Sequence, residues 1–194
     1  MEITLNNRLC ILIGPTTSGK TTLSKRIKDE FSENCKVISH DGVLSKIPKN
    51  QSQNQIDFQF RITLLKEIAS ALEDTSNKLV VLDTINILHE NFTAFVMGLR
   101  ALLNYNDEIT ILKMDVDLSL RQEFWRQRIA MYKALNMNDM LSAMDSNALF
   151  QQGALFKSNV GSLRTQLPST RNFIINDPTK VKINFDMPIS KVKR

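Results

Sequence analysis

The sequence lacks the features that would place the protein in a membrane or send it to a secretory pathway. None of its apolar runs reaches the roughly 18 residues of a membrane-spanning helix. The first residues, Met1 to Arg8, have neither the charged start nor the continuous apolar stretch of a signal peptide. We therefore expect a cytoplasmic protein without a membrane partner, although export by a leaderless route would leave no mark in the sequence.

Cysteine is scarce. The two cysteines, Cys10 and Cys35, are too few and too far apart for a disulfide framework or a zinc site, and their apolar neighbours favour buried structural roles. Low-complexity segments and fixed-period repeats are also absent, which argues against solenoids and long disordered tails. With 194 residues, of which 42% are apolar and 23% charged, the chain is expected to form a single domain, 1–194, with a full-sized core.

The chain carries a small excess of positive charge, +5, part of it in a basic C-terminal tail at residues 187–194. Such charge can attract nucleic acid. Basic residues are not interleaved with aromatic ones, however, so no platform for stacking bases is evident. A solvated surface is the favoured interpretation and nucleic acid the less favoured partner. The oligomeric state does not follow from these patterns.

Short apolar runs alternate with segments of helical spacing. We expect strands at 9–13, 37–39, 79–82, 109–114 and 173–175, a further extended segment at 181–185, and helices from Lys20 onward, over 56–72, 91–103 and 118–135, and within 139–159. This alternation predicts an α/β fold with a parallel sheet of about five strands and helices on both faces. Ligands of such sheets bind beyond the carboxyl ends of the strands.

A phosphate-binding loop follows the first predicted strand. Its pattern is G-x-x-x-x-G-K-T, in which glycines let backbone N–H groups surround an anion. Lys20 would contact the β- and γ-phosphates, Thr21 would ligate Mg²⁺, and the following helix would direct its positive end at the anion. The expected nucleotide-binding residues are Gly14, Pro15, Thr16, Thr17, Ser18, Gly19, Lys20, Thr21 and Thr22. The loop predicts ATP and Mg²⁺ as ligands, but kinases, switches, motors and transferases all use it.

Two aspartates follow other predicted strands. Asp41 could take the proton of an attacking hydroxyl, or could only cap a tight turn that Gly42 permits. His40 is the competing base, and its side chain is expected to project away from that of Asp41 if the strand continues. Asp83 is expected to hold Mg²⁺ directly or through water, the alternative being an aspartate that merely ends a strand. Asn86, three residues on, could orient a substrate or only cap the next turn.

Three arginines, Arg121, Arg126 and Arg128, lie on the helix predicted after the fourth strand, at the start of a lid region of roughly residues 121–160. Arginines brought in by a mobile segment stabilise a phosphoryl-transfer transition state. Arg121 and Arg128 share one helical face and Arg126 points elsewhere. A solvated basic face is the alternative interpretation.

Together these segments resemble a known family. The loop Gly14–Thr21, Ser39-x-Asp41, Asp83-Thr84-x-Asn86 and the segment Asp115 to Arg128 are similar to P-loop kinases grouped with polynucleotide kinase and chloramphenicol phosphotransferase, over about residues 8–177. The resemblance implies a three-layer, nucleoside-kinase-like P-loop NTPase fold and transfer of the γ-phosphate of ATP to a hydroxyl. It also implies Asp41 as the base, Arg126 and Arg128 as the lid arginines, and Asn176 to Thr179 near the adenine.

The sequence departs from this group in ways that concern the acceptor. Leu44 or a near neighbour replaces an arginine that polynucleotide kinases carry after the base, which weakens a nucleic-acid 5′-hydroxyl as the acceptor, and Phe124 stands where a further lid arginine is often found. A hydroxyl of a small molecule, nucleoside or polynucleotide is therefore expected, in a pocket built from residues 42–60 and 137–170.

Two other functions are alternatives. The run Gly-Pro-Thr-x-x-Gly-Lys-Thr, followed by Ile38-Ser39-x-Asp41, also resembles the start of adenylate and tRNA isopentenyltransferases, which act on an adenine amine, although the paired glycines after their third strand are absent here. A protein that senses a nucleotide, or hydrolyses it slowly, is the non-transferring alternative.

Overall fold

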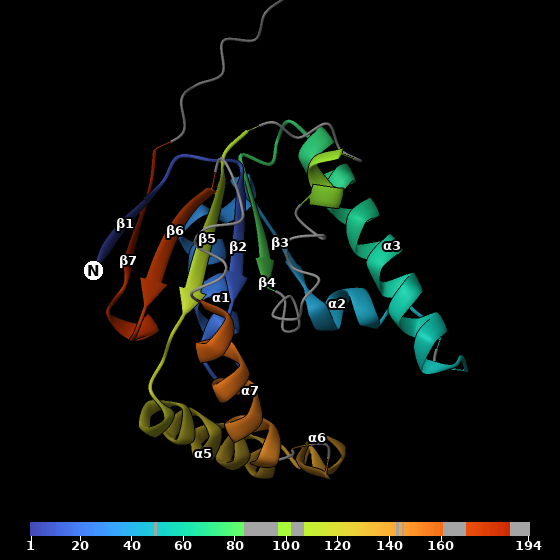
Figure 1. Ribbon diagram of the computed structural model, residues 1–194, viewed down its shortest axis with the longest axis vertical. Coiled ribbons are helices and arrows are strands. Elements are labelled where there is room, and N and C mark those ends of the chain that lie inside the picture. Colours follow the sequence, from blue (N-terminus) through green and yellow to red (C-terminus); the bar gives the residue numbers. More distant parts are fainter. Residues whose placement is uncertain are drawn as a thin grey trace, which may run out of the picture.

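The computed structural model describes residues 1–48, 50–83, 97–101, 107–142, 144, 146–160 and 170–186. Its centre is a sheet of five parallel strands in the order β3-β4-β2-β5-β6 (Figure 1). The strands are β2 (Leu9–Ile13), β3 (Cys35–Ser39), β4 (Leu79–Asp83), β5 (Ile109–Met114) and β6 (Thr170–Ile175). The predicted α/β fold and its five-stranded parallel sheet are confirmed.

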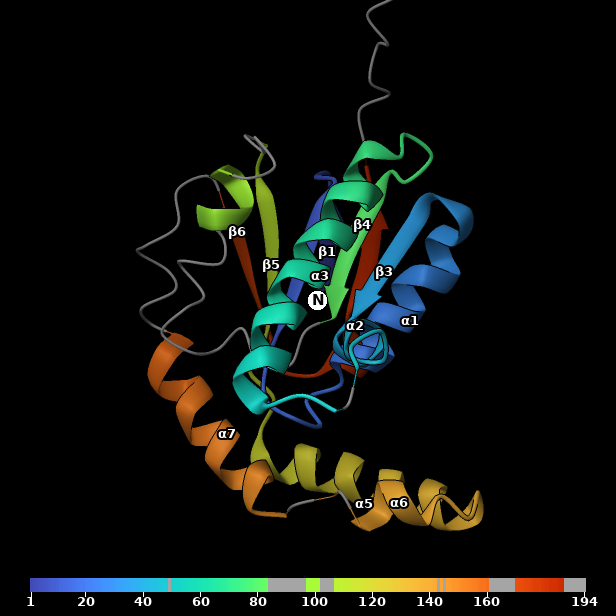
Figure 2. The ribbon, with the colours of Figure 1, turned by 90° about the vertical axis from the view of Figure 1, so that its right-hand side faces the viewer.

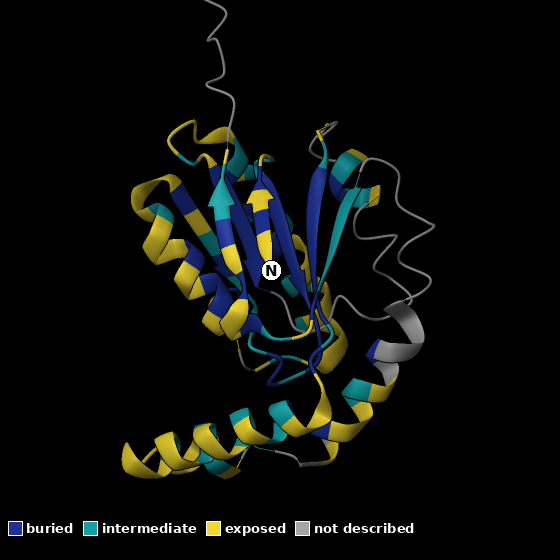
Figure 3. Ribbon diagram, turned by 90° about the vertical axis from the view of Figure 1, so that its left-hand side faces the viewer, coloured by how far each residue is buried: buried dark blue, intermediate teal, exposed yellow. Residues whose placement is uncertain are grey.

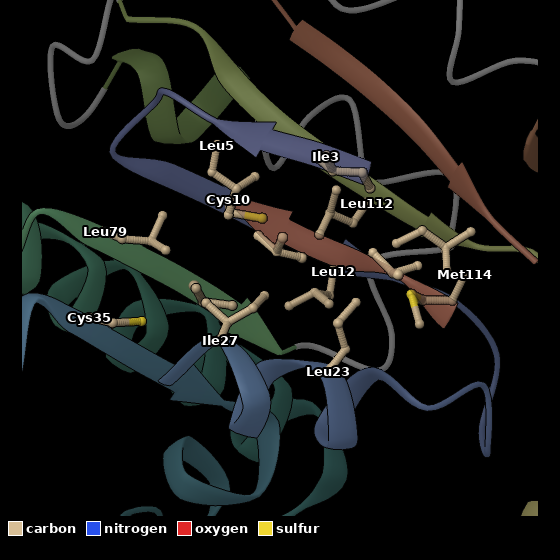
Figure 4. Packing of buried hydrophobic residues seen from close by; sticks show 14 of the residues in the cluster. Ile3, Leu5, Cys10, Leu12, Leu23, Ile27, Cys35, Leu79, Leu112 and Met114 are labelled. Carbon is tan, nitrogen blue, oxygen red and sulfur yellow. The ribbon is translucent and has the colours of Figure 1, made fainter. Parts of the chain in front are cut away.

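Helices cover both faces of this sheet, and the apolar runs of the sequence explain why. Every residue of β2, β4 and β5 is buried, because strands sandwiched between two helical layers are apolar on both sides. On one face α3 (Gln53–Glu73) packs with Leu64 and Ile68, and on the other α1 (Lys20–Phe31) packs with Leu23 and Ile27 (Figures 2 and 4). The three layers are therefore helix, sheet and helix.

A small second sheet lies on the α1 side. Strand β1 (Glu2–Leu5) pairs in parallel with β7 (Lys182–Phe185), from opposite ends of the chain. Ile3 and Leu5 are buried in the same cluster as Leu23 and Ile27 (Figure 4). Strand β1 was not predicted, since four residues alternating between exposed and buried positions give a weak signal.

Three helices project beyond the carboxyl edge of the sheet (Figures 1 and 2): α5 (Leu118–Ala134), α6 (Asn138–Ser142) and α7 (Ser146–Val160). We call them the lid helices. Much of α5 and α6 is exposed (Figure 3). They confirm the helix predicted over 118–135 and divide the one expected within 139–159 in two.

Several expectations differ in detail or lie elsewhere. Helix α3 starts before residue 56, because Ser52 and Gln55 form a capping box that begins it at Gln53. Most of the helix predicted over 91–103 lies outside the described residues, although 97–101 are helical, and the tail at 187–194 lies wholly outside them. Within the described part of the chain, no helix is long and apolar enough to cross a membrane.

Candidate nucleotide-binding site

The P-loop runs from the end of β2 to the start of α1, and both of its glycines are required by its geometry. Gly19 precedes α1 with φ of 83°, in the left-handed region that disfavours residues with a Cβ. At Gly14 a Cβ would lie 2.6 Å from the Cβ of Met114 and 2.8 Å from Oγ of Ser18. The backbone can therefore close tightly only with glycine at these positions.

Lys20 lies inside this loop. Its Nζ donates hydrogen bonds of 2.7 Å to the carbonyl oxygens of both Gly14 and Pro15 and lies 3.4 Å from Oγ of Ser18. Burial lowers the pKa of Lys20 to about 7; the nearby Asp83 carboxylate raises it, whereas the charges of Arg121 and Arg128 lower it further. A cation held in such surroundings is poised to take an anionic partner.

The groups expected to hold Mg²⁺ lie at the end of β4 and in the first turn of α1. Asp83 ends β4, is only 4% exposed, and accepts a hydrogen bond of 3.1 Å from Oγ of Ser24 on α1. Thr21 and Thr22 are exposed in the first turn of α1. No group of three or more His, Cys, Asp or Glu in the described chain could hold a metal by itself. A carboxylate and a hydroxyl nevertheless suit Mg²⁺, which usually keeps waters and takes phosphate oxygens.

Asp41 occupies the first turn of the short helix α2 (His40–Leu44), at the carboxyl end of β3. Ser39 caps this helix by accepting a hydrogen bond of 3.1 Å from the Gly42 N–H, so a short helix stands in place of the tight turn that Gly42 would permit. The divergence of the His40 and Asp41 side chains was expected only if the strand continued, and β3 ends at Ser39. Since helix rather than strand follows Ser39, Nδ1 of His40 lies 3.4 Å from Oδ1 of Asp41, and the His40 ring packs on Phe60 with centroids 4.7 Å apart.

The three arginines of α5 differ in their surroundings. Arg121 is 3% exposed and donates from Nε to the carbonyl oxygen of Thr16, at 3.2 Å, and from its terminal nitrogen to that of Leu149. Burial lowers its pKa. Arg128 is half-buried and close enough to depress the pKa of Lys20, whereas Arg126 is exposed. Arg121 was not among the expected catalytic residues, although the helical face that it shares with Arg128 was the signal for it.

The segment after β6 lies against the P-loop. A Cβ at Gly19 would be 2.6 Å from Cγ of Pro178 and 3.7 Å from a ring carbon of Phe124. Asp177 caps the short 3₁₀ turn η3 (Pro178–Lys180), and Arg26 of α1 donates to the carbonyl oxygen of Pro178 at 2.8 Å. A proline and an aromatic ring thus meet beside the loop glycine.

A cavity of about 160 Å³ lies beside the P-loop, beyond the end of β5. Pro15 and Arg121 line it together with Phe150 and Phe156 of α7, which fall in the range 137–170 expected to build an acceptor pocket. Asp115 adds a carboxylate. Asn86 lies outside the described residues.

A sequence profile matches the larger part of the chain. The family described as AAA domain matches residues 9–146, which run from the start of β2 to the start of α7. Among curated proteins, no significant match is found. The narrower grouping with polynucleotide kinase and chloramphenicol phosphotransferase stays a prediction.

Solved structures share the fold at low sequence identity. A candidate kinase from Chloroflexus aurantiacus aligns with a TM-score of 0.55 and 13% identity over 91% of this chain and 93% of its own. A sugar kinase from Janibacter aligns with a TM-score of 0.49 and 12% identity over 89% and 88% of the two chains. For a shikimate kinase from Acinetobacter baumannii the values are 0.47 and 16%, over 86% and 85%. The first likeness supports the fold, and identities this low carry no substrate.

Proposed function

The chain belongs to the AAA domain family, and we propose that it is an ATP-dependent phosphotransferase that moves the γ-phosphoryl group to a hydroxyl of a small molecule. One observation carries the proposal. The Lys20 ammonium lies within the P-loop, and the charges of Asp83, Arg121 and Arg128 all act on it. One anion-binding loop with a cation inside it, a buried carboxylate beside it and two further guanidinium groups forms the constellation that phosphoryl transfer needs.

The donor side follows from the P-loop. When ATP binds, its β- and γ-phosphates take the place of the Gly14 and Pro15 carbonyls as partners of Lys20, while the loop N–H groups and the start of α1 surround the oxygens. Thr21 and Asp83 would hold Mg²⁺, which neutralises part of the polyphosphate charge when bound. We place the adenine against Pro178 and Phe124, in keeping with the resemblance of the Asn176 to Thr179 segment.

Asp41 is the proposed base. Its side chain is 91% exposed, and His40, itself held by Phe60, lies beside it. As the acceptor oxygen forms its bond to the γ-phosphorus, the bond from that phosphorus to the β-bridging oxygen breaks and ADP leaves. The hydroxyl proton passes to the Asp41 carboxylate and from there to water.

The arginines of α5 act on the transferring group. Charge spreads over the γ-phosphoryl oxygens in the transition state, and fixed cations stabilise it there. Arg128 is the residue that we place on these oxygens, with Arg121 beside the loop; Arg126 is the alternative that the family resemblance offers.

The acceptor is proposed to be small. Leu44, or a near neighbour, stands where polynucleotide kinases carry an arginine, and Leu44 is 41% exposed on the same short helix as Asp41. An apolar side chain there does not favour a polynucleotide, which needs cations for its backbone. Nucleosides and polynucleotides therefore serve as comparison acceptors in the experiment that follows.

The experiment combines an acceptor screen with one substitution. We expect mass spectrometry to detect a phosphate added to one class of hydroxyl compound in the presence of MgATP, and Asp41→Asn to abolish the transfer while ATP affinity is retained. Transfer at near full rate in Asp41→Asn would remove the base from the proposal. Diphosphate release from dimethylallyl diphosphate and AMP would favour the isopentenyltransferase alternative. ATP binding without any transfer would favour a nucleotide sensor.

A further inference from the structure

The backbone of one P-loop residue is held on both sides by the lid helices. The Thr16 N–H donates to Oε1 of Gln152 on α7 at 2.8 Å, and the Thr16 carbonyl oxygen accepts from Nε of Arg121 on α5 at 3.2 Å. The same guanidinium donates to the carbonyl oxygen of Leu149, three residues before Gln152. We call Thr16, Arg121 and Gln152 the latch.

Arg121 is the buried member of the latch, whereas Thr16 and Gln152 are half-buried. Arg121 is 3% exposed, and its position depends on the absence of a side chain at Gly153: a Cβ there would lie 2.2 Å from a terminal nitrogen of the guanidinium. The guanidinium of Arg121 thus lies against the backbone of α7 at Leu149 and Gly153. A shift of Thr16 is therefore transmitted to α7 through two contacts, one from the side chain of Gln152 and one to the carbonyl of Leu149.

Thr16 belongs to the part of the P-loop that would lie beside the terminal phosphate of a bound nucleotide. Lysines of P-loops contact the β- and γ-phosphates. Here Nζ of Lys20 contacts the carbonyls of Gly14 and Pro15, the two residues that precede Thr16. The segment from Gly14 to Thr16 is therefore the part of the loop beside the γ-phosphate, and the amide of Thr16 is among the donors that an anion there would seek.

We propose that Gln152 occupies the place of a γ-phosphoryl oxygen on the Thr16 amide while the loop is empty, and that a bound triphosphate displaces it. This inference rests on the proposed function, since it assumes that the loop binds a nucleoside triphosphate. An amide N–H forms a stronger hydrogen bond with a charged phosphoryl oxygen than with a neutral carboxamide oxygen. Helix α7 thereby distinguishes a triphosphate from a diphosphate, which has no oxygen at that position.

The consequence is that Gln152 competes with the terminal phosphate, and with no other part of the nucleotide, for the Thr16 N–H. Each triphosphate that binds must first break the contact between Thr16 and Gln152, whereas a diphosphate leaves that contact in place. Release of Gln152 also removes one of the two contacts that connect α7 to Thr16. The other, from Arg121 to the Leu149 carbonyl, remains. With ADP as the product in the loop, the Thr16 N–H would again bind Gln152. Helix α7 would then return to the arrangement that it has without nucleotide.

Two substitutions at Gln152 test this, with the same substitutions at its exposed neighbour Gln151 as controls. Calorimetry in Mg²⁺ would measure the affinity for a non-hydrolysable ATP analogue and for ADP. We expect Gln152→Ala to tighten the analogue about two- to tenfold, since one competing hydrogen bond is removed, and to leave ADP unchanged. Gln152→Glu should weaken the analogue by more than about tenfold, since a carboxylate holds the amide more strongly and repels the γ-phosphate.

The proposed competition would be overturned if the affinities for the analogue and for ADP changed equally, or if neither variant changed any affinity. Hydrogen exchange gives an independent measurement: the analogue, but not ADP, should increase exchange in the α7 segment 149–156 of the unmodified protein. Circular dichroism confirms folding of each variant, and the exchange experiment needs no variant at all. Nucleotide binding, on which both proposals rest, fails if Lys20→Met leaves nucleotide affinity unchanged, and phosphoryl transfer fails if the acceptor screen finds no phosphorylated product. Both outcomes are separate from those at Gln152.

Discussion

Lys20 lies in surroundings that disfavour its own positive charge. It is 5% exposed, its hydrogen-bond partners are neutral carbonyls and a hydroxyl, and burial lowers its pKa to about 7. A bound polyphosphate would reverse this, because an adjacent anion favours the protonated form. We therefore expect Lys20 to exchange neutral hydrogen-bond partners for anionic ones when a nucleotide binds.

This exchange predicts how nucleotide affinity depends on pH. The free protein loses the Lys20 proton as the pH rises through about 7, whereas the nucleotide complex retains it to a higher pH. Binding must then take up a proton above pH 7, so affinity is greatest below pH 7 and should fall by up to about tenfold per pH unit above it. Calorimetry from pH 6.5 to 9 measures this decline.

Lys20→Arg is the matched control, since a guanidinium stays charged over this whole range and should give a flatter profile. An affinity that is constant between pH 7 and 9 in the unmodified protein would contradict the lowered pKa of Lys20.

At the scale of single elements, helix α5 presents its arginines in different directions. Arg121 and Arg128 act on the P-loop lysine, whereas Arg126 is exposed on another part of the helix. The spacing of 121 and 128, two turns apart, explains the shared face. Arg126 and Arg128 have the same chemistry but different surroundings, so substituting each in turn compares the two positions.

We expect Arg128→Ala to lower the rate of phosphoryl transfer by at least about 10²-fold, because it removes a cation from the transition state. Arg126→Ala should stay near the parent rate, as for most exposed substitutions. Single-turnover transfer to the acceptor found in the screen measures both. A larger loss at Arg126 than at Arg128 would show that the lid rearranges to bring the other face of α5 to the phosphate.

At the scale of the whole molecule, two segments far apart in the sequence, 2–5 and 182–185, pair in one small sheet. Glu2 pairs with Lys182 and Leu5 with Phe185, and the buried residues Ile3 and Ile183 join the core on the α1 side. Arg26 of α1 also donates to the carbonyl oxygens of Pro178 and Val181, just before β7. Helix α1 thus holds η3, which packs against the P-loop, in place just before β7.

Ile3→Ala separates stability from function. Ile3 is 1% exposed, so its truncation should lower the free energy of unfolding by about 2–5 kcal/mol, measured by denaturant titration. The exposed neighbour Thr4→Ala should change it little. Because β1 supplies no group to the site, nucleotide affinity measured well below the midpoint should stay at the parent value in both variants. A loss of affinity in Ile3→Ala would mean that β1 controls the loop directly.

The local features followed from the sequence because their causes are local. The apolar runs of the five sheet strands and the glycines and lysine of the P-loop predicted the fold and the position of Lys20. Helix α2 was missed because its start depends on one hydrogen bond from the Gly42 N–H to Ser39, and the same residue types also form turns. The resulting approach of His40 to Asp41 was missed for the same reason.

What only the tertiary structure decided are the contacts between distant segments. β1 needed a partner near residue 182, and Thr16 of the P-loop meets Arg121 and Gln152, 105 and 136 residues away along the chain. Periodicity assigns a residue to a face of its own helix, but the packing of α5 and α7 against the loop determines which atoms come within hydrogen-bonding distance. The sequence by itself therefore determined the phosphate-binding-loop pattern and the strands around it, and the folded arrangement determined which side chains surround that loop.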